Sequence, residues 1–142
     1  MNDSVNQIRN TTGKWPDLAR KIMGIGAGLA GLAVGTGAFG AHGLREVIDP
    51  QALQLWKTAV DYQMHHALGL LALGLSAMVS PESRHPAVQR SAVALIVGLV
   101  LFCGSLYALA LGAPRVVGAL TPIGGLILMA GWFFWATTAL RR

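Results

Sequence analysis

The sequence predicts an all-α fold, an integral membrane bundle of four transmembrane helices, and three observations carry this prediction. Hydrophobic residues make up 54% of the 142-residue chain and charged residues only 12%, whereas about a quarter of an ordinary soluble domain is charged. The mean hydropathy is +0.54. Four apolar stretches approach the roughly 20 residues that a spanning helix needs, and they cover about residues 22–44, 63–79, 91–111 and 122–140.

The chain divides into a tail and one membrane domain. Residues 1–21 are polar and basic and show little apolar periodicity, so we expect a mobile cytoplasmic tail. Residues 22–142 form the single four-helix domain. The first apolar run, residues 22–44, is 23 residues long, beyond the roughly 7 to 15 of a signal peptide. We therefore expect it to stay in the membrane uncleaved.

The first span is rich in glycine, with eight glycines between Gly24 and Gly43. In lipid the backbone has no other partner, so a helix is forced, and glycine lets neighbouring helices approach closely. Two stripes of small residues result. The first is Gly24, Gly28, Gly31, Gly35, Ala38 and His42, and the second is Gly26, Ala30, Ala33, Gly37 and Gly40.

The second helix starts at Asp49-Pro50, because proline suits the first helical turn. Residues 51–79 are too long for the hydrocarbon core alone, so they divide into an amphipathic interfacial segment, about 51–62, and a span, about 63–79. The two are one tilted helix or a kinked pair. A stripe of polar and small residues follows this helix, formed by Gln54, Thr58, Asp61, His65, Gly69, Ala72 and Ser76. We expect the first glycine stripe to pack against it and to bring His42 to Asp61 and His65.

The third and fourth spans follow a polar loop at residues 80–90. Gly112 marks the end of the third span. The fourth begins either with Thr121 as N-cap and Pro122 in the first turn, which we prefer, or near Val116 with a kink at Pro122. The aromatic residues 132–135 are expected to form an interfacial belt.

Topology follows from the lysines and arginines. The side of the membrane that holds both termini carries eight of them and the other side carries three, which places both termini in the cytoplasm. The basic residues are scattered rather than grouped on one helix face, which excludes a nucleic-acid interface. The lone Cys103 lies in an apolar run and is expected to pack.

A candidate functional cluster is predicted near the outer face, and it consists of His42, Asp61, Tyr62, His65 and His66. Imidazoles beside a carboxylate can bind a metal, ligate haem or relay protons, or can simply hydrogen-bond across helices. No metal-ligand set is fixed, and no cofactor is predicted. Two GxGxxG matches in the first span lack the strand and the water-accessible pocket that dinucleotide binding requires. No nucleophile with a base is evident, so an enzyme ranks third.

Several motifs together resemble those of the YgdD-like family of small bacterial inner-membrane proteins, which has related small transmembrane proteins in animals. They are GAFGAHGL at 37–44, the Trp56 to Leu68 segment, LFCGSLYALAL at 101–111 and TPIGG at 121–125. Cys103 stands where serine is more usual. The resemblance implies a four-span bundle and supplies no activity.

Two functions of different classes remain. The first is a scaffold or accessory protein that acts through helix–helix contacts with itself or with a membrane-protein partner in the lipid bilayer, with Gly24, Gly28, Gly31, Gly35 and Gly69 as packing positions. The second is a small-solute or proton pathway, or a metal or haem site, that uses the histidine and aspartate cluster.

Overall fold

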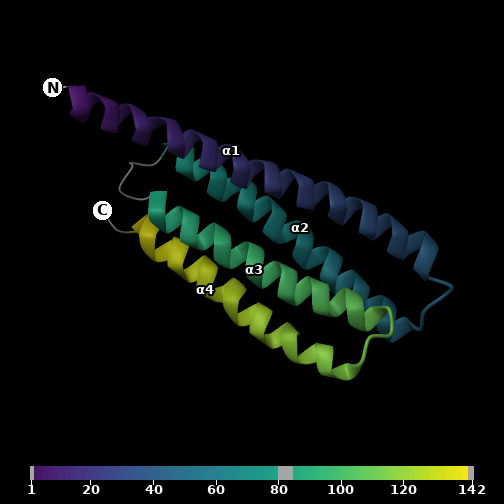
Figure 1. The fold of residues 1–142 in the computed structure, drawn as a ribbon. Coiled ribbons are helices and arrows are strands. Elements are labelled where there is room, and N and C mark those ends of the chain that lie inside the picture. The colour runs from purple at the N-terminus through teal and green to yellow at the C-terminus, as the bar shows by residue number, and fades with distance from the viewer. Residues whose placement is uncertain (1, 80–84, 141–142) are drawn as a thin grey trace.

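In the computed structural model the chain forms four α-helices over the part that is described, which is the backbone of residues 2–79 and 85–140 and the side chains of 17–79 and 86–140. The helices are α1 (Asn2–Phe39), α2 (Pro50–Val79), α3 (His85–Ala110) and α4 (Leu120–Leu140). They lie side by side in chain order, each antiparallel to the next, and both termini are at the same end (Figure 1). Each helix packs mainly on its neighbour in the chain.

Three of the helical segments are long and apolar enough to cross a membrane by length and composition, namely Asp17–Leu44, Pro86–Ala110 and Arg115–Leu140. The second helix, α2, does not reach the same apolarity. Its first half carries Gln51, Gln54, Lys57 and Asp61, all of them exposed. The all-helical class is therefore confirmed over the described residues, with three candidate spans.

The helix boundaries differ from the expected ones at both ends of the chain. α1 begins at Asn2, so the segment expected to be a tail is helical before the apolar run begins. A helix nucleated in the apolar run extends at little cost, because each added residue gains one hydrogen bond. α4 begins at Leu120, after a 3-10 turn at Arg115–Ala119, so Thr121 is not its N-cap. The Thr121 hydroxyl instead shares a 2.7 Å hydrogen bond with Ser105.

α2 is one continuous helix rather than a kinked pair, and it starts where the Asp49-Pro50 pattern predicts. Asp49 Oδ1 accepts hydrogen bonds from the backbone N–H groups of Gln51 at 2.9 Å and Ala52 at 3.0 Å. These groups have no partner inside the helix, so the carboxylate caps it.

Removing this cap is expected to destabilise the start of α2. Asp49→Ala should lower the free energy of unfolding by about 1 kcal/mol, because two N–H groups lose their acceptor. Faster hydrogen exchange at the Gln51 and Ala52 amides, together with a lower Tm in detergent, would show it. Asp49→Asn keeps an acceptor oxygen and should stay close to the unsubstituted protein, so equal loss in both variants would contradict the capping role.

Gly112 ends α3, as predicted from its position before Ala113-Pro114. Its φ of +89° is in the left-handed region that glycine adopts without strain. The N–H of Ala113 bonds to the carbonyl of Ala108 at 2.9 Å, and the N–H of Gly112 bonds to that of Leu109 at 3.0 Å. This paired arrangement satisfies carbonyls that the last helical turn leaves free.

The core runs along α2 and α3, where Leu70, Leu73 and Leu95 are fully buried. Cys103 is buried in the same core, as expected, and its thiol donates to the Ala59 carbonyl at 3.3 Å. α3 and α4 approach closely where Gly98 meets Gly124: a β-carbon added at Gly124 would lie 2.5 Å from the backbone nitrogen of Phe102.

The expected contact between the first glycine stripe and the polar stripe of α2 is wrong. A β-carbon added at Gly24, Gly28, Gly31 or Gly35 would meet nothing within 4 Å. We call these four positions the outer glycine face. The second stripe makes the contact instead: a β-carbon at Gly26 would lie 2.8 Å from the Ala67 carbonyl oxygen, and one at Gly40 would lie 2.6 Å from the Trp56 ring.

Candidate functional site

The five residues of the predicted cluster divide into an exposed group and a pair that lines a pocket. His42, in the π-helical segment Gly40–Leu44 that continues α1, is exposed, and so are Asp61 and His65 on α2. Tyr62 is 43% exposed and His66 only 8%. The clustering expected for His42, Asp61 and His65 is not seen: within the described side chains, no hydrogen bond or ion pair joins them and no three His, Cys, Asp or Glu residues form a metal-binding group.

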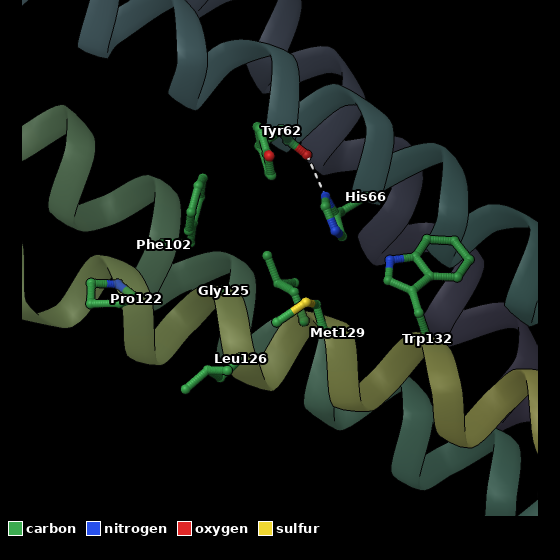
Figure 2. A pocket seen from close by; sticks show the side chains of 9 residues that line it. Tyr62, His66, Phe102, Pro122, Gly125, Leu126, Met129 and Trp132 are labelled. Atoms are coloured by element: carbon green, nitrogen blue, oxygen red, sulfur yellow. Dashed lines mark hydrogen bonds between the residues drawn. The ribbon is translucent and has the colours of Figure 1, made fainter.

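Tyr62 and His66 line a groove between α2 and α4, with Phe102 of α3 beside Tyr62 (Figure 2). We call it the His66 groove. Its volume is about 480 Å³, and its lining is completed by Pro122, Gly125, Leu126, Leu128, Met129 and Trp132 from α4. The walls are almost entirely apolar or aromatic, so the His66 ring is their main polar group.

Trp132, one of the aromatic residues expected in an interfacial belt, lines this groove. Its ring centroid lies 6.0 Å from that of His66. A β-carbon at Gly69 would lie 2.7 Å from the Trp132 ring, so the missing side chain at Gly69 is what lets the indole lie against α2. Gly69, predicted as a packing position, therefore shapes the groove as well.

The His66 ring has one nitrogen bonded and one free. Nδ1 lies 2.7 Å from the backbone carbonyl oxygen of Tyr62, which can only accept, so Nδ1 carries the proton and donates. In that tautomer Nε2 has a lone pair and no proton. Across the described residues no group bonds to Nε2, and Figure 2 shows this side of the ring turned away from Tyr62 toward α4.

A second polar group, which the sequence reasoning missed, connects three helices. Gln63 is 4% exposed; its Nε2 donates to the Leu29 carbonyl at 3.0 Å, and its Oε1 accepts from the Tyr107 hydroxyl at 2.9 Å. The Tyr107 hydroxyl lies 3.2 Å from that of Thr36, and Trp56 Nε1 donates to the Thr36 carbonyl at 2.8 Å. We call Thr36, Trp56, Gln63 and Tyr107 the Gln63 cluster.

The Gln63 cluster ties the helices together and has no ionised member. Its hydrogen bonds join α1 to α2 and α2 to α3. One signal in the sequence could have revealed it, because Gln63 is the only amide side chain in the apolar stretch 63–79. A buried amide in such a stretch must find partners on neighbouring helices.

The comparisons with known proteins place the chain in a family. A profile described as "Protein of unknown function (DUF423)" matches residues 36–125. The chain belongs to the DUF423 family. Among its relatives is a "UPF0382 membrane protein" of Staphylococcus epidermidis, 43% identical over 117 residues, which are 82% of this chain and 93% of the relative. No solved structure matches the chain.

DUF423 proteins extend beyond one group of bacteria. The "UPF0382 membrane protein YwdK" of Bacillus subtilis is 41% identical over 117 residues, 82% of this chain and 94% of that protein. The "UPF0382 membrane protein C1782.12c" of Schizosaccharomyces pombe is 41% identical over 116 residues, 75% of this chain and 91% of that protein. These relatives are named as membrane proteins, in agreement with the three candidate spans. The predicted small membrane family of unknown function is thus confirmed.

The matched region, residues 36–125, contains the Gln63 cluster and most of the His66 groove, and it leaves out the outer glycine face. Chemically, the groove offers the Nε2 acceptor of His66 among walls that are mainly apolar or aromatic. The structure adds no nucleophile paired with a base among the residues that it describes.

Proposed function

We propose that this protein is a four-span inner-membrane scaffold or accessory protein that acts by helix–helix contact through the outer glycine face of α1. The observation that carries the proposal is the open space beside Gly24, Gly28, Gly31 and Gly35. Small residues spaced in this way let a second helix approach closely in lipid. They contribute nothing to packing within this chain, so their natural use is contact with another chain, either a second copy or a different membrane protein.

The proposal includes α2 as the fourth helix that spans the membrane. α2 lies between α1 and α3 along its length (Figure 1), and both of these are long and apolar enough to span. From Gln63 to Val79 it carries no Asp, Glu, Lys or Arg. Its exposed polar positions, such as Gln54 and Asp61, lie in the half next to its start. The excess of basic residues on the side of the termini favours a cytoplasmic location for both.

The alternative function, a small-solute or proton pathway through the histidine and aspartate cluster, has weaker support. His42, Asp61 and His65 are exposed on the surface of α1 and α2 rather than gathered around a passage. A proton or ion route through a membrane protein needs polar groups that face the interior. The outer glycine face therefore carries the better proposal.

Cysteine crosslinking in native membranes tests the contact. In a Cys103→Ser background, Gly28→Cys and Gly31→Cys are each expected to form a disulfide-linked dimer, or an adduct with a partner, after mild oxidation. Ala130→Cys is the matched control, because Ala130 is also exposed but lies on α4. A band from the α1 positions and none from Ala130→Cys would support the proposal.

A bulky residue on the same face should break the contact without harming the fold. Gly31→Ile in the Gly28→Cys protein, and Gly28→Ile in the Gly31→Cys protein, are expected to reduce the crosslinked fraction at least about tenfold, because a β-branched side chain keeps the two backbones apart. The Tm in detergent should not change. Failure to find any crosslinked species at Gly24, Gly28, Gly31 or Gly35 would refute the proposed function.

A further inference from the structure

The His66 groove combines features that a structural histidine does not need. The imidazole is 8% exposed, and its Nε2 lone pair has no partner among the described residues. Among the described side chains the fully buried polar atom without a partner is Ser91 Oγ, whereas His66 Nε2 is open to the groove. This atom faces a groove of about 480 Å³ rather than packed core, so a ligand can satisfy it.

The chemistry of that ligand follows from the acceptor. The hydrogen bond to the Tyr62 carbonyl fixes the proton on Nδ1, which leaves Nε2 able to accept and unable to donate. A ligand that bonds to Nε2 must therefore present an O–H or N–H group. Metal binding would need further ligands, and no suitable group of three lies within the described part of the chain.

The walls of the groove favour a flat aromatic ring. Tyr62 stacks on His66 at 5.9 Å between centroids with an interplanar angle of 16°, and Tyr62 lies 4.5 Å from Phe102. Trp132 closes the other side, and the Met129 thioether lies on the α4 side (Figure 2). Aromatic faces and a thioether pack well against another ring, and the volume is that of an ordinary small-ligand pocket.

The groove opens sideways, where a ligand dissolved in lipid can enter. Leu126 is 62% exposed and Met129 51% exposed along its rim. His66 lies near the middle of α2, sixteen residues after Pro50 and thirteen before Val79. If α2 crosses the bilayer as proposed above, this position is close to the bilayer centre.

From these observations we propose that the His66 groove binds a membrane-soluble aromatic alcohol, a flat hydroxyl-bearing ring whose O–H donates to His66 Nε2. The ring packs between Tyr62, Phe102 and Trp132. This proposal requires that α2 crosses the bilayer, as proposed above. It does not depend on the outer glycine face, so the ligand site and the helix contact can each fail without the other.

Binding of two matched probes to the full-length protein in detergent micelles tests it. 1-Naphthol carries the hydroxyl, and 1-methoxynaphthalene has the same ring system without a donor. We expect naphthol to bind at least about tenfold more tightly, the usual worth of one buried hydrogen bond. His66→Phe keeps a ring and removes the acceptor, so the preference should disappear. His65→Phe, the same change at the exposed neighbour, should keep it.

Two further measurements keep the test decisive if His66→Phe does not fold. In protein labelled with ¹⁵N-histidine, naphthol should shift the Nε2 resonance of His66, and methoxynaphthalene should not. Gly125→Leu should weaken binding of both probes, because it fills the groove, and a β-carbon there makes only ordinary contact with Phe102 at 3.7 Å. Equal affinity for the two probes, an unmoved Nε2 resonance, or a haem absorption band in the isolated protein would overturn the proposal.

Discussion

Gly26→Leu is expected to abolish folding, whereas Gly28→Leu, two residues further along the same helix, should leave the fold intact. A β-carbon at Gly26 would lie 2.8 Å from the Ala67 carbonyl oxygen and 3.0 Å from the Leu71 backbone nitrogen. These are backbone atoms of α2, so relief requires the whole helix to move. Overpacking of a well-packed site usually costs about 1 to 3 kcal/mol, and a full leucine against backbone should exceed that range.

The two variants form a matched pair. Both replace glycine with leucine in the same apolar run, so they raise the tendency of α1 to insert into the membrane equally. Tryptophan fluorescence during titration with denaturing detergent, at a dilution where the chains are monomeric, measures the free energy of unfolding. Equal loss in both variants would mean that the outer glycine face packs within the chain, contrary to the structure.

Local chemistry in the sequence was enough to predict where two helices begin or end. Asp49 caps α2 through its own side chain, and Gly112 ends α3 because its conformation is one that glycine adopts easily. Both effects depend on residues a few positions apart. The all-helical class and the four helices depend on similarly short-range patterns and were predicted correctly over the described residues, whereas only three of the four helices are apolar enough to be candidate spans.

The register between helices could not be predicted in the same way. α1 carries two stripes of small residues on opposite faces, and either could pack. The choice was decided by large side chains on α2: the Trp56 ring lies over Gly40, and Leu71 lies beside Gly26. The rule that polar stripes turn inward misled the prediction, because the polar positions Asp61 and His65 are exposed while Gln63 is buried.

The sequence singled out two residues of the His66 groove and missed the others. Tyr62 and His66 stood out because they carry polar groups in an apolar region, and the structure brings them into one groove. Trp132 could not be assigned to that groove, because its contact with Gly69 depends on how α4 lies against α2. No pattern within α4 itself contains that information.

Gln63→Leu is expected to produce the second large loss of stability. The substitution removes the donor to the Leu29 carbonyl and the acceptor of the Tyr107 hydroxyl. We expect a loss of about 1 to 3 kcal/mol, because two hydrogen bonds between helices are removed, each worth about 0.5 to 1.5 kcal/mol. Titration with denaturing detergent measures it. Gln54→Leu is the control at an exposed position of the same helix, and it should change stability by less than about 0.5 kcal/mol.

A double-mutant cycle with Tyr107→Phe then separates this bond from the rest of the cluster. Tyr107 keeps the Thr36 hydroxyl at 3.2 Å when Gln63 is replaced, so the coupling should be only about 0.6 kcal/mol, the average for hydrogen bonds between membrane helices. A coupling near zero would mean that the Gln63–Tyr107 bond contributes no stability. A value above about 1.7 kcal/mol, the largest of that class, would mean that Thr36 does not replace Gln63 as a partner. We expect an intermediate coupling energy because the Tyr107 hydroxyl has two partners. When Gln63 is replaced, the hydroxyl stays bonded to Thr36.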